Sequence, residues 1–261
     1  MTPAITGEFF LEERRQRILQ QLHRRGRVSV AELSQSFGVS EVTIRTDLQA
    51  LAARNLVVRT HGGAMRAPEA PLIPSLATRR QQQVAEKQRI GQKAAALVAD
   101  GDAVILDSSS TTLAIAQRLR TRRDLTVITN SLAIAQEFLD AAGVTVVMPG
   151  GSLRRETASL VGGDGVEFLH KYNVQKGFFG AHGLTLAEGL TDVSPLEAEV
   201  KRPLVALCRE VIAVLDATKW GRLGLASFAG LDQVVRVITD DQAPGPLVEE
   251  VRARGIDVVL V

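Results

Sequence analysis

The sequence predicts an α/β protein of two domains: a small N-terminal domain of three helices and a β-hairpin, then a larger domain built on a mostly parallel sheet. Three observations support this prediction. The chain has 261 residues, more than an average single domain needs. A proline-bearing segment, residues 67–78, is typical of an extended linker. Beyond it, β-branched runs alternate with helical ones. The domains are therefore expected at residues 1–66 and 79–261.

The composition fits this fold class. Apolar residues make up 45% of the chain and charged residues 23%, as in ordinary soluble globular proteins. Aromatic residues make up only 4%, so aliphatic side chains must fill the core, which favours α/β over an aromatic-rich all-β fold. No apolar run approaches the ~18 residues that a membrane span needs, and no signal peptide is recognisable at the N-terminus. We therefore expect a cytoplasmic protein with no membrane partner.

The first domain follows from helical periodicity and turn signals. Apolar residues recur at helical spacing in three segments, which are separated by Gly26 and by a Gly38 turn whose Ser40 is a good N-cap. A β-prone run interrupted by Gly62 and Gly63 then predicts a hairpin. Three helices followed by a hairpin form a winged helix-turn-helix. The helices are expected at residues 12–23, 30–37 and 41–53.

The positive charge of the chain is concentrated in this domain. Residues 1–66 contain ten arginines, no lysine and six acidic residues, whereas the remainder has 21 basic and 23 acidic residues. A solvated basic face would explain the charge alone, but in a helix-turn-helix such a face binds the phosphates of duplex DNA. A winged helix used for protein contacts would leave the arginines unexplained. We expect DNA contacts from the third helix and the hairpin, through Ser40, Glu41, Thr43, Arg45, Thr46, Gln49, Arg59 and His61.

Within that set the residue types suggest separate roles. Arg45 projects from the N-terminal half of the third helix, where it can bond a guanine through two parallel hydrogen bonds. Arg59 and His61 lie on the predicted wing and would meet phosphates or the minor groove. The third helix is therefore expected to read sequence and the wing to hold the backbone.

The second domain is predicted to open with one long helix over residues 79–99. After it, strands alternate with helices as in a parallel sheet with helices on both faces, where ligands bind at the carboxyl ends of the strands. Strands are expected at residues 103–107, 125–129, 144–148, 176–180, 211–216, 234–239 and 257–261. Helices are expected at residues 111–119, 131–139, 194–207 and 247–255.

A hydroxyl-rich turn follows the first of these strands. The strand ends at Asp107, and a helix begins near Thr111, so backbone N–H groups, the helix dipole and several hydroxyls converge. The same residues would also serve a simple capped turn, and no P-loop motif GxxxxGK[ST] occurs. We expect this turn to bind a phosphate through Asp107, Ser108, Ser109, Ser110, Thr111 and Thr112.

Polar and glycine residues also follow other predicted strands. Each group alone is weak evidence, because turns favour such residues for local reasons. Together they mark the carboxyl edge of one sheet, and we expect them to complete a single binding site. They are Thr129, Asn130, Gly150, Gly151, Arg154, Gly180, Gly183, Glu197, Lys201, Asp216 and Lys219.

Several functional classes find no support. The four histidines have no metal-ligand spacing and no CxxC or HExxH motif exists, so neither a metal nor another cofactor is expected. No GxSxG nucleophile motif is present. The single cysteine, Cys208, cannot form an intramolecular disulfide and is expected to be a small apolar residue on a buried helix face.

The ordered motifs resemble those of the DeoR family of bacterial regulators over nearly the whole chain. They are VSEVTIRTDL and RTHGGA in the first domain, then LDSSSTT, VITNS, PGGSLR, FFGAHG, GLTD, the Glu197 and Lys201 pair, and LDATKWG. The resemblance implies a C-terminal domain similar to ribose-5-phosphate isomerase that acts as a sensor of a phosphorylated sugar. It also implies dimers or tetramers, and it gives Lys219 a place in the family's D-x-[ST]-K pattern. This chain departs from the family at Ser109, usually Gly, and at Thr46, often Arg or Asn.

The sequence therefore predicts a transcriptional regulator that binds double-stranded operator DNA as a homodimer or homotetramer. It is expected to repress a sugar-metabolism operon under control of a small phosphorylated sugar, and not to be an enzyme. One rival is a sugar-phosphate isomerase or deaminase with acid and base among Glu197, Lys201, Asp216 and Lys219. The other is a non-specific DNA binder, which would leave the second domain without a role.

Overall fold

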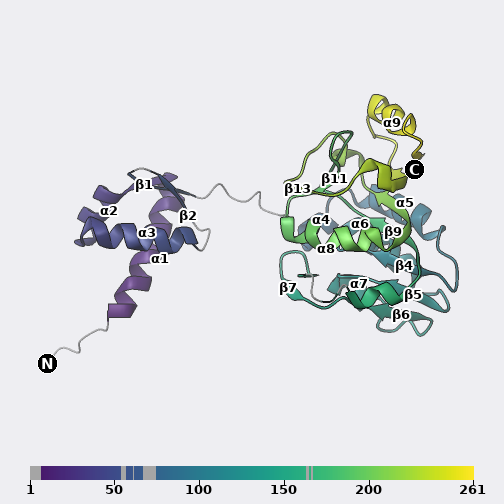
Figure 1. Ribbon diagram of the computed structural model, residues 1–261, viewed down its shortest axis with the longest axis horizontal. Helices are drawn as coiled ribbons and strands as arrows, with labels where there is room; N and C mark the ends of the chain where they lie inside the picture. Colours follow the sequence, from purple (N-terminus) through teal and green to yellow (C-terminus); the bar gives the residue numbers. More distant parts are fainter. Residues whose placement is uncertain (1–6, 54–56, 61, 67–74, 163–164, 166) are drawn as a thin grey trace. The chain divides into compact units, whose positions relative to one another are not determined.

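The computed structural model describes residues 7–53, 57–60, 62–66, 75–162, 165 and 167–261. The chain forms two compact units, Met1–Leu72 and Ile73–Val261 (Figure 1). Most of the proline-bearing segment, residues 67–74, lies outside the described residues, so the expected extended conformation is not addressed there.

The first unit contains three helices and a three-stranded antiparallel sheet. The predicted second and third helices have the expected bounds, while the first extends further at both ends. A short strand before the second helix was not predicted. The elements are α1 Gly7–Arg25, β1 Arg27–Ser29, α2 Val30–Phe37, α3 Glu41–Ala53, β2 Val57–Thr60 and β3 Gly63–Arg66. The predicted winged helix-turn-helix is thus confirmed.

Local interactions explain where these elements begin and end. Ser29 caps α2 by accepting the Glu32 N–H, and Gly38 ends α2 in the left-handed conformation. The strands pair in the order β1-β3-β2. A Cβ at Gly63 would lie 2.0 Å from the carbonyl oxygen of Val28, so only glycine allows β3 to approach β1 this closely. The helices bury an aliphatic core of Ile18, Leu22, Leu33, Ile44, Leu48 and Leu51.

The second unit is an α/β domain whose elements follow in this order: α4 Leu76–Arg80, α5 Val84–Ala95, β4 Ala103–Leu106, α6 Ser110–Leu119, β5 Leu125–Ile128, α7 Leu132–Glu137, β6 Val144–Val147, β7 Ser152–Arg154, β8 Ser159–Val161, η1 Glu167–Lys171, β9 Val174–Phe179, β10 Gly183–Thr185, β11 Gly189–Asp192, α8 Pro195–Ala206, β12 Cys208–Val214, η2 Ala217–Lys219, β13 Ala226–Ala229, η3 Leu231–Gln233, β14 Val234–Thr239, α9 Gly245–Arg252 and β15 Asp257–Leu260.

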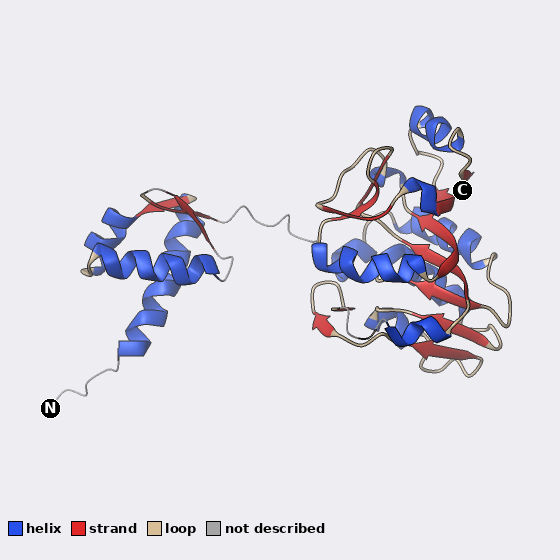
Figure 2. Ribbon diagram, in the orientation of Figure 1, coloured by secondary structure: helices blue, strands red, loops and turns tan. Residues whose placement is uncertain are grey.

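Seven of these strands form one parallel sheet, as predicted, in the order β15-β14-β12-β9-β4-β5-β6 (Figure 2). Its strands are apolar on both faces. Val104 and Leu106 of β4 pack in the core with α5 and α6, whereas Ile105 belongs to the opposite core with residues of α8. Helices therefore cover both sides, which explains why these strands read as continuous apolar runs.

The strand order reverses at the centre of the sheet. From β4 the chain moves outward through β5 and β6, then returns to place β9 on the other side of β4 and continues outward through β12. Adjacent strands whose connections leave in opposite directions open a crevice at their carboxyl ends, the common ligand site of such sheets. In this protein the crevice lies beyond Leu106 and Phe179.

The predicted long helix over residues 79–99 is wrong. The chain forms two helices, α4 and α5, with a break at Gln83, whose φ is 47°. The buried Lys87 ammonium donates to the carbonyl oxygens of Arg79 and Gln82 and so ties α5 to the residues before the break. In addition, α4 begins at Leu76, inside the segment assigned to the linker.

Two other expectations are corrected. Cys208 does not lie on a helix face but opens β12, half-buried, with its thiol pKa raised to about 12 by burial. The glycine-rich stretch after β6 is not only a loop, because it contains the β7–β8 hairpin. A further small sheet, β10-β11-β13, was not predicted.

Candidate functional site

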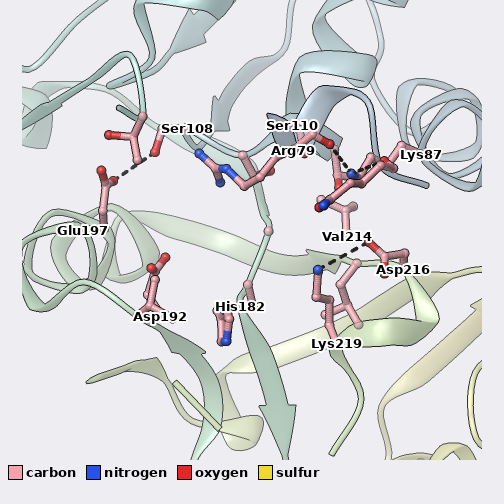
Figure 3. A pocket seen from close by; sticks show the side chains of 18 of the residues that line it. Arg79, Lys87, Ser108, Ser110, His182, Asp192, Glu197, Val214, Asp216 and Lys219 are labelled. Atoms are coloured by element: carbon pink, nitrogen blue, oxygen red, sulfur yellow. Dashed lines mark hydrogen bonds and ion pairs between the residues drawn. The ribbon is translucent and has the colours of Figure 1, made fainter. Parts of the chain in front are cut away.

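A cavity of about 290 Å³ lies at the carboxyl ends of β4 and β9, where the strand order reverses (Figure 3). We call it the β4–β9 cavity. Many of the residues predicted from strand ends line it together, although they come from distant parts of the sequence. They are Ser108, Ser109, Ser110, Thr111, Gly180, Glu197, Lys201, Asp216 and Lys219.

The turn after β4 presents the start of α6 to this cavity. Ser109 caps α6 by accepting the Thr112 N–H at 3.1 Å, and Asp107 Oδ1 accepts the Ser109 N–H at 3.0 Å. The N–H groups of Ser110 and Thr111 follow in the first helical turn, where no helical acceptor exists. Both residues line the cavity, so these donors and the positive end of the helix dipole are available to an anion.

Ser109 also determines what can stand at the end of β9. A Cβ at Gly180 would lie 2.4 Å from both Cβ and Oγ of Ser109. Glycine is therefore required at 180 as long as serine occupies 109. Ser109, where the family usually has glycine, therefore fits because residue 180 has no side chain.

A buried ion network supports the base of the cavity. Lys201 Nζ lies 2.9 Å from Asp107 Oδ2, 2.9 Å from Asp192 Oδ2 and 2.9 Å from the Gly180 carbonyl oxygen. These acceptors use all three ammonium hydrogens. Burial lowers the pKa of Lys201, but the two carboxylates outweigh it and hold that pKa above its ordinary value. Burial alone would raise the pKa of Asp192, but the Lys201 charge outweighs burial, so the pKa of Asp192 is lower than its ordinary value.

Both carboxylate oxygens of Glu197 also accept hydrogen bonds. Its Oε2 accepts from Ser108 Oγ at 3.1 Å and its Oε1 from Ser159 Oγ at 2.6 Å. Lys201 has no hydrogen left for a substrate, and both Glu197 oxygens already hold serine hydroxyls, so for these two residues the geometry favours a structural role over the acid and base roles of the isomerase rival. Glu197 and Lys201 instead tie α8 to the turn after β4 and to the end of β9.

Three buried polar atoms in the cavity have no hydrogen-bond partner among the described residues: Arg79 Nε, Arg79 Nη2 and Asp216 Oδ2. Figure 3 shows the Arg79 side chain extending across the cavity toward Ser108. The Lys219 ammonium is 3.9 Å from Asp216 Oδ2, beyond hydrogen-bond reach. Buried polar atoms are normally paired, and a group that carries both hydrogen-bond acceptors and donors would pair with these three.

The electrostatics of the cavity favour an anion. Burial lowers the pKa values of Lys87 and Lys219. The pKa of His182 is lowered by burial and by the positive charges of Arg222 and Lys219. Crowded cations of this kind are stabilised when a negative ligand enters.

Several residues that line the cavity were not among the predicted site residues: Arg79, Gln82, Lys87, Thr157, Ala181, His182, Asp192, Val193, Val214, Leu215 and Arg222. His182 and Asp192 stand in the FFGAHG and GLTD motifs and could have been found there. Arg79 and Lys87 gave no such signal, because a continuous helix would not bring them to a strand end. Only the break at Gln83 does so.

The structure does not place the remaining predicted residues on the cavity. Asp107 and Thr112 lie behind the turn that they hold together. Thr129 and Asn130 follow β5, one strand away, and Asn130 donates to the Leu160 carbonyl oxygen at 3.1 Å. Neighbouring strands are ~4.8 Å apart, so their ends cannot all reach one small ligand.

The same correction applies to the loop around β7 and to β10. Gly150 and Gly151 lead into β7, where a Cβ at 151 would lie 2.5 Å from the Val161 carbonyl oxygen. Arg154 donates to the Ser194 hydroxyl. Gly183 begins β10, packed against the backbone of Arg222. These residues position the loops that surround the cavity.

On the first unit, α3 presents most of the predicted DNA-contacting residues to solvent. Glu41, Arg45, Thr46 and Gln49 are exposed, and Arg45 Nη2 lies 2.6 Å from Glu41 Oε2. Thr43 is half-buried, with its hydroxyl 2.9 Å from that of the capping Ser40. Arg59 is exposed on β2, and His61 lies outside the described residues.

Two features of α3 were not predicted. Val42 is 68% exposed on the same face as Arg45, and an apolar side chain there suits the methyl group of thymine. Asp47 is 1% exposed and accepts from Arg14 Nε at 2.6 Å and Arg15 Nε at 3.0 Å. These two arginines therefore join α1 to α3, and only part of the basic charge of this unit lies on a DNA-facing surface.

Family comparisons agree with both units. The family model described as the DeoR C-terminal sensor domain matches residues 82–241. The model of the DeoR-like helix-turn-helix domain matches residues 14–69.

The chain belongs to the DeoR family.

Curated relatives span nearly the whole of this DeoR-family chain. A putative aga operon transcriptional repressor of Escherichia coli O157:H7 is 34% identical over 251 residues, covering 95% of this chain and 93% of the relative. The transcriptional repressor GlcR of Bacillus subtilis (strain 168) is 35% identical, covering 88% of this chain and 89% of the relative. This DeoR-family chain is thus a DNA-binding transcriptional regulator and not an enzyme.

Among solved structures, ribose 5-phosphate isomerase A of Methanocaldococcus jannaschii is similar, with a TM-score of 0.39 and 18% identity over 51% of this chain and 53% of that chain. In the part of this DeoR-family chain that the structure describes, no group of His, Cys, Asp or Glu is arranged to hold a metal ion. None of the described helices is long and apolar enough to cross a membrane.

Proposed function

We propose that the chain is a cytoplasmic repressor of a sugar-metabolism operon, controlled by a phosphorylated sugar that binds in the β4–β9 cavity. The observation that carries this proposal is the set of unpaired buried atoms there. Arg79 offers two donors beside the hydroxyl turn of Ser109, Ser110 and Thr111, and Asp216 offers an acceptor. The names of relatives, such as the aga operon repressor, support a role in sugar metabolism.

A phosphorylated sugar matches both kinds of unpaired atom. Its phosphate oxygens accept from Arg79, from the first-turn N–H groups of α6 and from the cationic Lys219, and its hydroxyls donate to Asp216. Inorganic phosphate lacks the sugar hydroxyls that would extend from the phosphate to Asp216, and a neutral sugar would leave the arginine unpaired. The cavity volume of about 290 Å³ is at the lower end for small-ligand sites. A single sugar ring or chain is the size that fits.

On the DNA side, α3 would lie in the major groove of an operator half-site, with Arg45 and Gln49 on base edges and Arg59 on a phosphate. Two half-sites need two copies of the chain, so the working form is a homodimer or homotetramer. A tenfold release from the operator requires about 1.4 kcal/mol of coupling between the effector and DNA sites.

The test is a titration of full-length protein bound to fluorescent operator DNA. Ribose 5-phosphate, fructose 6-phosphate, galactose 6-phosphate and glucosamine 6-phosphate are compared with their unphosphorylated parents. At least one phosphorylated sugar should change the operator affinity by about tenfold or more, and no parent should do so. A complex that responds to no phosphorylated sugar, or equally to a parent, contradicts the proposal.

A charge substitution locates the site. Thr111→Glu places a carboxylate beside the expected phosphate and should abolish the response while operator binding by the free protein persists. Ser109→Glu should do the same, although it also removes the α6 cap, worth about 1 kcal/mol. Thr121→Glu, in the exposed turn after α6, is the matched control and should respond as wild type does. A normal response by Thr111→Glu would exclude this cavity.

A further inference from the structure

Arg79 combines a free hydrogen-bonding edge with an unusual position in the chain. Its unpartnered atoms, Nε and Nη2, are the two nitrogens whose N–H bonds run parallel along one edge of the guanidinium. That edge forms paired hydrogen bonds with two oxygens of a phosphate. Arg79 also lies between the ranges matched by the two family models, which end at residue 69 and begin at residue 82.

The helix that carries Arg79 is where the chain enters the second unit. α4 is the first helix after residues 67–74, and its Leu76 N–H donates to the Glu156 carbonyl oxygen at 2.8 Å. At the other end, Lys87 Nζ donates to carbonyl oxygens of Arg79 and of the turn that follows, at 2.7 and 2.6 Å. A helix of five residues has little stability of its own, so these few contacts and its packing decide how firmly it is held.

The other phosphate-facing groups sit on a rigid element. Ser110 and Thr111 begin α6, whose Leu113, Ile115 and Ala116 are buried in the core shared with α5 and the sheet. Because α6 is packed into the core, its contacts with a phosphate should differ little between states of the regulator. A ligand shifts a two-state equilibrium only through contacts that differ between the states. The bond to Arg79 can differ, because α4 is short and lies at the boundary of the unit.

We infer that Arg79 transmits effector binding to the DNA-binding unit: the phosphate binds its free guanidinium edge and thereby fixes α4, the helix that receives the chain from that unit. This inference rests on the proposed function, since it requires a phosphorylated ligand in the β4–β9 cavity. It assigns α6 to holding the phosphate and Arg79 to coupling. A substitution of Arg79 should then abolish the release of operator DNA even when the effector is bound at saturation.

The experiment uses the full-length chain with Arg79→Gln and the matched control Arg80→Gln, whose side chain is exposed on the same helix outside the cavity. Operator release is measured by fluorescence at saturating concentrations of the same four sugar phosphates. Amide hydrogen exchange of residues 75–80 is measured with inorganic phosphate and with each sugar phosphate. Binding of each to the DNA-free protein is followed by calorimetry.

For wild type and Arg80→Gln, the sugar phosphate that binds should slow exchange in α4 and release the operator. For Arg79→Gln, it should bind about tenfold or more weakly, and even at saturation it should neither slow exchange in α4 nor release the operator. Full release by saturated Arg79→Gln overturns the inference, as does α4 exchange in wild type that no bound phosphate changes. Failure of every sugar phosphate to bind wild type is a different result, which contradicts the proposed function itself.

Discussion

Lys201 and Lys219 both line the β4–β9 cavity, but their surroundings differ. Lys201 is 3% exposed and has three acceptors at 2.9 Å, two of them carboxylates. Lys219 is more exposed and has one carboxylate at 3.9 Å. Removing a cation from a buried network leaves uncompensated charge, whereas breaking a 3.9 Å pair whose lysine is partly exposed changes the stability less. The first lysine should therefore stabilise the fold, and the second should serve the ligand.

Replacing each lysine with methionine separates these roles. Lys201→Met should lower the free energy of unfolding by about 3–5 kcal/mol, because the carboxylates of Asp107 and Asp192 lose their cationic partner. Lys219→Met should change it by less than about 1 kcal/mol while weakening binding of the phosphorylated effector. Urea denaturation and calorimetric titration measure the two quantities. Equal losses of stability in both variants would refute the distinction.

The lowered pKa values of Lys87 and Lys219 predict a pH dependence of effector binding. Burial favours their neutral forms in the free protein, and a phosphate dianion would raise both pKa values again. Binding therefore takes up protons, and affinity should fall as the pH rises toward the lowered lysine pKa values, below the ordinary 10.5. Below about pH 6 the phosphate gains a proton and affinity should fall again.

Calorimetric titration of the full-length protein with the effector between about pH 5.5 and pH 9.5 measures this profile. Buffers of different ionisation enthalpy reveal the number of protons taken up on the alkaline side. An affinity that increases steadily to the alkaline limit, or binding that releases protons there, would show that neither lysine meets the phosphate.

At the scale of elements, α3 and the β2–β3 wing present different chemistry to DNA. α3 exposes Arg45 and Val42 on one face, which suits base edges. The wing exposes Arg59, which suits a phosphate. The ion pair between Arg45 and Glu41 is solvent-exposed and at i,i+4 spacing, so it is weak enough to open when a guanine becomes available.

Alanine substitutions should separate base reading from backbone binding. Arg45→Ala should lower affinity for the operator by about 1–3 kcal/mol and affinity for random DNA much less. Arg59→Ala should weaken both alike and reduce the dependence of log K on log salt by about one unit. Fluorescence anisotropy at several salt concentrations measures all four affinities. Equal losses on both DNAs for Arg45→Ala would remove it from base reading.

At the scale of the whole molecule, one winged helix provides too small a DNA interface for the affinity of about 10⁻⁸ M typical of operators. Two copies that bind two half-sites supply the rest. The full-length chain should therefore be at least a dimer in solution, and light scattering at about micromolar concentration measures this. A monomer that retained full operator affinity would contradict the expectation.

The sequence by itself determined the order and type of the main helices and of the seven strands of the parallel sheet. Periodicity and capping placed α2 and α3 at their observed bounds: α2 ends at Gly38, and α3 begins after the Ser40 cap. Apolar runs predicted the parallel sheet, since strands buried on both faces have no polar alternation. The hydroxyl turn after Asp107 was also predictable, because a strand-to-helix turn rich in Ser and Thr is a local signal.

Tertiary structure alone decided which predicted residues share a site. Strand order brings Ser109, Gly180 and Asp216 together and separates them from Asn130, which follows β5. The break at Gln83 brings Arg79 to the cavity, and no helical or strand periodicity in the sequence predicts that break. Local patterns record what each segment prefers, whereas a binding site depends on pairings between segments far apart in the chain. That is why the sequence showed the hydroxyl turn after Asp107 but not the unpaired arginine across the cavity from it.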